Sequence, residues 1–90
     1  MRDKVKIART ERFKRAYRKL TPENREGARK ALRLLLQNLR HPSLRVKRIR
    51  GTRDIWEARV TCSCRMTFQI EDDICLLRNI GEHDEGLGKP

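Results

Sequence analysis

The spacing of apolar residues changes along the chain, from two to three or four and back to two. Residues 5–9 alternate apolar and polar side chains, which predicts a short first strand. The residues that follow have the spacing of one helical face: Phe13, Ala16, Tyr17 and Leu20. Thr10 stands where a helix N-cap is needed. The first fifth of the chain therefore predicts a strand followed by a short, strongly basic helix.

A second helix is predicted from Thr21 to about Leu39. A Thr-Pro-Glu sequence at residues 21–23 combines a good cap, a tolerated first-turn proline and an acidic group at the positive end of the helix dipole. The apolar stripe consists of Ala28, Ala31, Leu32, Leu35, Leu36 and Leu39. The His-Pro pair at residues 41–42 ends this helix. We expect a helical hairpin whose stripe covers a sheet.

Four strand-like runs with period two follow the second helix, at residues 44–49, 55–60, 64–70 and 74–80. Short gaps separate them, which favours antiparallel pairing. We expect an α+β fold in the order β-α-α-β-β-β, with the helical hairpin packed on a mainly antiparallel four-stranded sheet. Ninety residues make a single domain, residues 1–90, in which 84–90 form a short C-terminal tail.

The register of two strands follows from the turn between them. If this turn has an odd number of residues centred on Cys62, one face is apolar throughout. That face carries Trp56, Ala58, Val60, Cys64, Met66 and Phe68, and we expect Trp56 to be structural. The opposite face carries Glu57, Arg59, Arg65 and Thr67, with Arg59 directly across from Arg65. Because facing like charges destabilise a sheet, this pair indicates that an anion binds there.

A second turn, at residues 72–73, lays the last strand beside the preceding one, so that Ile80 or Asn79 lies near Arg65. His83 comes just beyond Gly81. Two guanidiniums and one imidazole are then expected at one end of one sheet face. This set suits cleavage of a phosphodiester by an internal 2′-hydroxyl, because arginine stabilises the phosphate charge and histidine can protonate the leaving oxygen.

The charge balance extends this picture. Lys and Arg number 23 against 12 Asp and Glu, a net charge of +11, which favours a polyanion such as RNA as partner. An anionic membrane surface or an acidic protein are the alternatives. No segment approaches the roughly 18 apolar residues that span a bilayer, and the N-terminus does not resemble a signal peptide. We therefore expect a cytoplasmic protein with no membrane partner.

The sequence favours chemistry without a cofactor or metal. It contains no Asp/Glu cage for Mg²⁺. The alternative is a zinc site made of Cys62, Cys64, Cys75 and His83. Its Cys-x-Cys spacing differs from the Cys-x-x-Cys spacing of the usual zinc knuckle. We expect these cysteines to be small buried hydrophobes on strands, in a reducing compartment.

Three segments of the chain resemble the RelE/ParE toxin superfamily: residues 56–60, 65–68 and 76–84. The shared features are an aromatic residue, an Arg three positions later, an Arg opening the next strand, and a Gly-x-His near the end. The resemblance implies the toxin of a type II toxin-antitoxin system, a metal-independent, ribosome-dependent mRNA endoribonuclease that inhibits translation and is neutralised by an acidic antitoxin.

The resemblance also implies roles for particular residues. Arg59 and Arg65 hold the scissile phosphate, and His83 is the catalytic acid. Three residues before the Trp strand are assigned RNA binding: Lys47, Arg48 and Arg50. Glu57 is a possible accessory residue that orients an arginine or acts as a base.

Two other functions are compatible with the same sequence. ParE-like members of the superfamily poison DNA gyrase, although Arg65 and His83 weigh against that activity here. A basic RNA-binding module without catalysis is the other alternative. Many active relatives have an aromatic residue shortly after the terminal His, whereas this chain has none after His83.

Overall fold

The computed structural model describes residues 5–52 and 54–82. Its elements are β1 (Lys6–Arg9), α1 (Glu11–Arg18), α2 (Pro22–Gln37), a 3₁₀ turn η1 (Pro42–Leu44), β2 (Lys47–Arg48), β3 (Trp56–Arg59), β4 (Cys64–Glu71) and β5 (Ile74–Glu82). The strands form one sheet in the order β1-β5-β4-β3-β2. β1 runs parallel to β5, and the other neighbours are antiparallel. The predicted α+β class and the mainly antiparallel sheet are confirmed.

The predicted strand count was wrong: the sheet has five strands instead of four. The additional strand is β2, in which Lys47 pairs with Glu57 and Arg48 with Trp56. β2 lies inside the period-two run predicted at residues 44–49, but only two residues of this run pair with a neighbouring strand. The four-strand order left out one of the five predicted strand-like segments.

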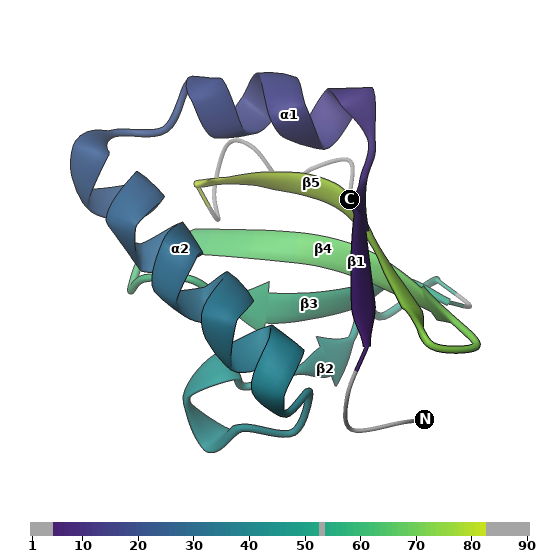
Figure 1. The fold of residues 1–90 in the computed structure, drawn as a ribbon. Coiled ribbons are helices and arrows are strands. Elements are labelled where there is room, and N and C mark those ends of the chain that lie inside the picture. Colours follow the sequence, from purple (N-terminus) through teal and green to yellow (C-terminus); the bar gives the residue numbers. More distant parts are fainter. Residues whose placement is uncertain (1–4, 53, 83–90) are drawn as a thin grey trace.

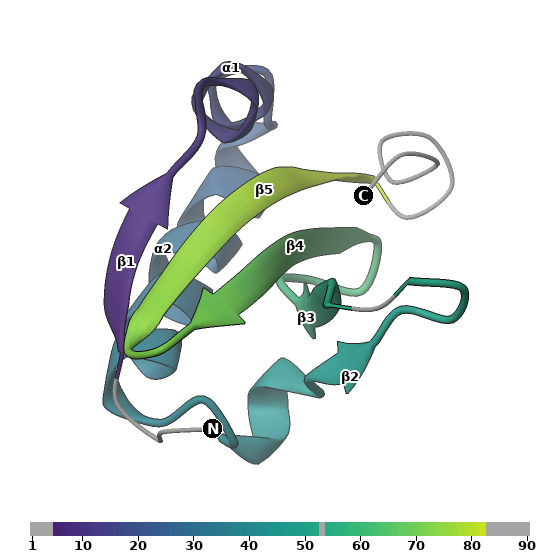
Figure 2. The same cartoon turned by 90° about the vertical axis from the view of Figure 1, so that its right-hand side faces the viewer.

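Both helices lie on the same side of the sheet (Figures 1 and 2). The hydroxyl of Thr10 accepts a hydrogen bond from the Phe13 amide at 3.1 Å, which caps α1. Thr21 caps α2 in the same way. A short turn joins the two helices, but they then run in clearly different directions: α1 follows β5, and α2 crosses the sheet obliquely (Figure 1). α2 ends at Gln37, two residues before the predicted end.

The core lies between the helices and the apolar sheet face. Ala28, Ala31 and Leu35 of α2 and Phe13 of α1 are buried there. The sheet contributes Ala58, Cys64, Met66, Phe68, Cys75, Leu77 and Ile80. Trp56 pairs with Phe68 and packs against this core while partly buried, as its expected structural role requires. One residue of the predicted apolar stripe of α2, Leu36, does not belong to the core. Its side of the helix faces away from the sheet, and Leu36 is 47% exposed.

The turn between β3 and β4 has the predicted odd length. The amide of Val60 donates to the Cys64 carbonyl at 2.9 Å, which leaves residues 61–63 as the turn. Gly27 of α2 packs directly against it: a Cβ at Gly27 would lie 2.6 Å from Thr61 Cγ2 and 3.1 Å from the Val60 carbonyl oxygen. The close approach of α2 to this turn at Gly27 therefore requires that residue 27 has no side chain.

We expect Gly27→Ala to destabilise the protein by about 1–3 kcal/mol, the usual cost of overpacking. The sign is diagnostic, because Gly→Ala at an open helical position stabilises a protein by about 0.4–1 kcal/mol. Thermal and urea unfolding measure the change, with Lys30→Ala on the exposed side of α2 as control. An increase in the melting temperature on Gly27→Ala would show that the turn moves away at no cost.

Candidate active site

The sheet face opposite the helices is polar, and no helix of the described residues covers it (Figure 2). Strand register arranges this face in rows. One row contains Lys47, Glu57, Thr67 and Asn79. The next contains Arg59, Arg65 and Gly81. The prediction that Arg59 lies directly across from Arg65 is confirmed, so two guanidiniums start from adjacent positions on one face.

Arg65 is held in a fixed orientation by the β3–β4 turn. Its Nη1 donates to the carbonyl oxygens of Thr61 at 2.6 Å, Cys64 at 3.0 Å and Cys62 at 3.2 Å. Its Nε lies 3.8 Å from Glu57 Oε1, and the side chain is only 19% exposed. Within the described part of the chain, Nη2 has no such partner. A fixed guanidinium with one unengaged nitrogen can bind an anion with little further loss of side-chain entropy.

Arg59 reaches the same turn from the other strand. Its Nη2 donates to Cys62 Sγ at 3.2 Å, while Arg65 Nη1 contacts the Cys62 carbonyl oxygen. The two guanidiniums therefore converge on one residue. Without a ligand the two positive charges repel each other. An anion bound between them would stabilise this arrangement.

Glu57 is the carboxylate in the middle of this cationic group. Its Oε1 lies 3.8 Å from Arg65 Nε and 4.0 Å from Lys47 Nζ, and its side chain is 13% exposed. One negative charge beside the three positive charges of Lys47, Arg59 and Arg65 leaves the group with a net charge of about +2 at neutral pH. The geometry fits the predicted accessory role of Glu57 in orienting an arginine.

A β-bulge changes which β5 side chains lie on the polar face. Thr67 pairs with Asn79. The next residue of β4, Phe68, pairs with Leu77, which leaves Arg78 as the extra residue. The expected alternation of side chains between the two faces therefore breaks at Arg78.

The polar face carries an arginine that the sequence analysis did not identify. Arg78 Nη1 donates to Oε1 of Gln69, a β4 residue on the same face as Arg65. The bulge returns Ile80 to the core side, where it is buried. Simple period-two counting gives no signal for such a shift, which moves the register opposite Arg65 one residue beyond Ile80. The partner of Arg65 is Gly81.

The structure separates the three residues that were assigned RNA binding. Lys47 lies on the polar face, in register with Glu57. Arg48 pairs with Trp56 and therefore belongs to the opposite, helix-covered face, where it is exposed at the edge of the sheet. Arg50 is exposed in the turn after β2. His83 and the predicted tail at residues 84–90 lie outside the described residues.

The alternative zinc set is incompatible with the sheet. Cys64 pairs with Glu82 at one end of the β4–β5 ladder, and Cys75 pairs with Ile70 six residues further along β4. At about 3.3 Å per residue the two thiols start roughly 20 Å apart, too far to share one ion. As expected, Cys64 and Cys75 are buried, but Cys62 is exposed in the turn. No group of three or more potential metal ligands occurs among residues 5–52 and 54–82.

Burial also makes the two strand cysteines unreactive. Loss of hydration, reinforced by the carboxylate of Glu82, raises the pKa of the Cys64 thiol to about 11. Burial alone raises the pKa of the Cys75 thiol to about 12. Since the thiolate is the reactive form, both side chains act at neutral pH as small hydrophobes.

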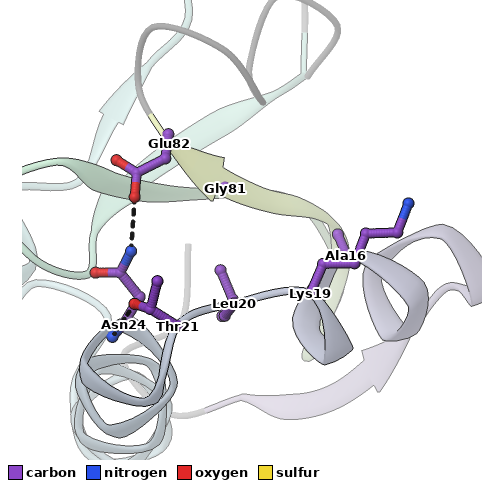
Figure 3. Close-up of a pocket in the computed structure, with 7 residues that line it drawn as sticks. All are labelled: Ala16, Lys19, Leu20, Thr21, Asn24, Gly81 and Glu82. Atoms are coloured by element: carbon purple, nitrogen blue, oxygen red, sulfur yellow. Dashed lines mark hydrogen bonds between the residues drawn. The ribbon is translucent and has the colours of Figure 1, made fainter.

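A surface cavity of about 350 Å³ lies beside the end of β5, under the connection between the two helices. Figure 3 shows its lining: Ala16, Lys19, Leu20, Thr21, Asn24, Gly81 and Glu82. On its floor Asn24 Nδ2 donates to Glu82 Oε1 at 2.8 Å (Figure 3). This contact ties α2 to the strand end next to the Arg59–Arg65 row.

None of the helices in the described residues is long and apolar enough to cross a membrane.

Known proteins are similar to this chain in structure but not in sequence. No protein-family model matches the sequence, and no curated protein sequence matches it significantly. YafQ from E. coli has a TM-score of 0.75 at 12% identity, with 90% of this chain and 96% of YafQ covered. The archaeal RelE of the RelE-RelB complex from Pyrococcus horikoshii has a TM-score of 0.72 at 13% identity, with 90% and 97% covered.

A third similar structure is the E. coli RelBE toxin-antitoxin complex, with a TM-score of 0.67 at 24% identity over 84% of this chain and 93% of the other. Two helices on one face of a mainly antiparallel sheet are thus the fold that this chain shares with these structures. The chain has the RelE-like toxin fold, as the sequence motifs predicted.

Proposed function

We propose that this protein is the toxin of a toxin-antitoxin pair and cleaves messenger RNA on the ribosome without a metal ion. The observation that carries the proposal is the convergence of Arg59 and Arg65 on the β3–β4 turn, on the sheet face opposite the helices of a RelE-like fold. The net charge of +11 favours an RNA partner and fast association with it.

The proposed reaction needs three groups. The 2′-hydroxyl of the RNA gives its proton to a solvent base while its oxygen attacks the adjacent phosphorus. The bond from phosphorus to the 5′-oxygen breaks, which gives a cyclic phosphate and a new 5′-hydroxyl. Arg59 and Arg65 Nη2 stabilise the charge on the phosphate oxygens, where donors held in place beforehand are most effective. His83 supplies the proton to the 5′-oxygen. Glu57 keeps Arg65 in orientation through its contact with Nε.

The test is cleavage of mRNA on translating ribosomes, mapped by primer extension, beside a DNA supercoiling assay with purified gyrase. We expect cut mRNA and unaffected supercoiling. Gyrase inhibition without cut mRNA would assign the chain to the gyrase poisons. RNA binding that weakens steeply with salt but yields no product would leave only a non-catalytic RNA-binding module.

The proposed antitoxin is an acidic protein, and a groove between the helices suits it. The groove has a volume of about 400 Å³ and an apolar floor that includes the exposed Leu36. Arginines surround this floor: Arg9, Arg29 and Arg33. An amphipathic segment with an acidic edge would match both features. Similar structures were solved as complexes with antitoxins.

Co-expression of a small acidic protein encoded beside this chain should abolish cleavage, and failure of every such protein to bind would contradict the proposal.

The bulge residue Arg78 gives a further prediction for RNA binding. We expect Arg78→Ala to weaken association with mRNA-loaded ribosomes several-fold and to lower the slope of log affinity against log salt by about one, as loss of one phosphate contact does. Single-turnover cleavage at saturating toxin should stay near the wild-type rate. Arg48→Ala, on the helix-covered face, is the matched control. Equal losses of affinity in both variants would show that only total charge matters.

A further inference from the structure

Asn24 joins three separate parts of the fold through one buried amide. The residue lies in the first turn of α2 and is only 6% exposed. Its Nδ2 donates to Glu82 Oε1 at the end of β5, and its Oδ1 accepts a hydrogen bond from Thr61 Oγ1 in the β3–β4 turn, each at 2.8 Å. Polar groups buried in this way are costly unless bonded. The amide therefore holds α2, the turn and the strand end in one arrangement.

The turn that Asn24 holds is the one that fixes Arg65. Thr61 Oγ1 accepts from the Cys64 amide at 3.1 Å, and the Thr61 carbonyl oxygen accepts from Arg65 Nη1 at 2.6 Å. A continuous set of hydrogen bonds thus runs from Asn24 through Thr61 to the guanidinium. The contact at Gly27 leaves the turn no room to move toward α2.

Glu82 connects the same amide to the other strand of the site. Glu82 pairs with Cys64, and its neighbour Gly81 pairs with Arg65. Figure 3 shows the Glu82 side chain directed toward Asn24, on the helix side of the sheet. The carboxylate thereby anchors the strand end that lies beside Arg65 without occupying the polar face.

We propose that Asn24 is a positioning residue of the active site: its hydrogen bonds to Thr61 and Glu82 hold the β3–β4 turn and the end of β5 against α2, and so keep Arg65 in its productive orientation. This inference rests on the proposed ribonuclease function. A misplacement of about 1 Å in a reacting group can cost about 10²-fold in rate, even when its cause is remote from the chemistry.

The experiment reverses the polarity of one hydrogen bond. Asn24→Asp puts a carboxylate against Glu82, which removes the donor and adds like-charge repulsion. Asn24→Asp combined with Glu82→Gln restores a donor and an acceptor in the opposite sense. Asn38→Asp, the same change at the other end of α2, is the matched control, because Asn38 Oδ1 accepts only a backbone amide there.

We expect Asn24→Asp to lower the rate constant for cleavage about 10- to 100-fold, with KM changed less than threefold. The double variant should recover most of the rate, and Asn38→Asp should cleave like the wild type. The defect of Asn24→Asp should shrink toward pH 6, because two adjacent carboxylates raise one pKa and then share a proton. A loss of stability caused by the same repulsion would follow the same pH dependence, so the orientation of Arg65 is measured separately.

A second measurement keeps the outcomes separate. The Nε–H signal of Arg65 in NMR spectra should exchange slowly in the wild type, broaden in Asn24→Asp and sharpen again in the double variant. If the wild type cleaves but Asn24→Asp cleaves equally well, or the folded double variant is as slow as the single one, the positioning role is overturned. If the wild type does not cleave mRNA, the proposed function fails. The positioning role is tested independently of cleavage, because an Arg65 signal that is unchanged in Asn24→Asp would overturn it.

Discussion

Arg65→Ala is expected to slow cleavage of ribosome-bound mRNA by a factor of about 10² to 10³, the scale of losing one preorganised donor to a developing oxyanion. The reason is the fixed orientation of the guanidinium, which the β3–β4 turn holds through three carbonyl oxygens. Nη2, which has no partner among residues 5–52 and 54–82, should then meet the phosphate without reorganisation. Growth arrest on expression of the protein should disappear. Single-turnover cleavage on programmed ribosomes measures the loss.

The controls for Arg65 separate charge from geometry. Arg65→Lys keeps the charge but has no planar fork, so most of the rate should still be lost. Arg48→Ala removes a positive charge from the other face and should leave the chemical step intact. Circular dichroism must show that Arg65→Ala is folded, because the variant also removes the bonds to the turn. Cleavage at the wild-type rate by folded Arg65→Ala would contradict the proposed mechanism.

His83→Gln is the second large effect that we expect. Glutamine keeps a polar side chain but cannot donate a proton as an imidazolium does, so a contribution of about 10² to 10⁴ from general-acid catalysis should be lost. Ribosome binding should largely remain, because the cationic face is unchanged. The wild-type rate should fall as pH rises through the pKa of this imidazole, close to 6.5 for an unperturbed histidine. This pH dependence should be absent in His83→Gln.

The other histidine of the chain is the control. His41 caps the 3₁₀ turn by accepting a hydrogen bond from the Ser43 amide, away from the polar face. His41→Gln should therefore cleave with the pH profile of the wild type. If both His83→Gln and Arg65→Ala cleave without impairment, the ribonuclease mechanism fails and gyrase poisoning becomes the better explanation. A sedimentation binding assay on the same variants distinguishes lost chemistry from lost association.

Local patterns were sufficient for much of the fold. The two Thr-capped helices, the strands from β3 to β5 and the facing pair Arg59–Arg65 were predicted from spacing, cap residues and one short turn. These features depend on interactions between residues close in sequence, for which helical and strand periodicity is a direct signal. The strand count was one too low because the expected order kept only three of the four runs after the second helix, and the run at residues 44–49 pairs with β3 only at Lys47 and Arg48.

The candidate site was predictable only where it depended on this local register. The sequence by itself determined the charge of the polar face and the position of Arg59 opposite Arg65. Tertiary structure decided that the bulge turns Asn79 and Gly81 onto this face and Ile80 into the core, and that Arg48 lies on the other face. It also decided that Asn24 meets Thr61, 37 residues away, and Glu82, 58 residues away. A buried amide finds its partners through the packing of whole elements, and such packing leaves no periodic trace in the chain.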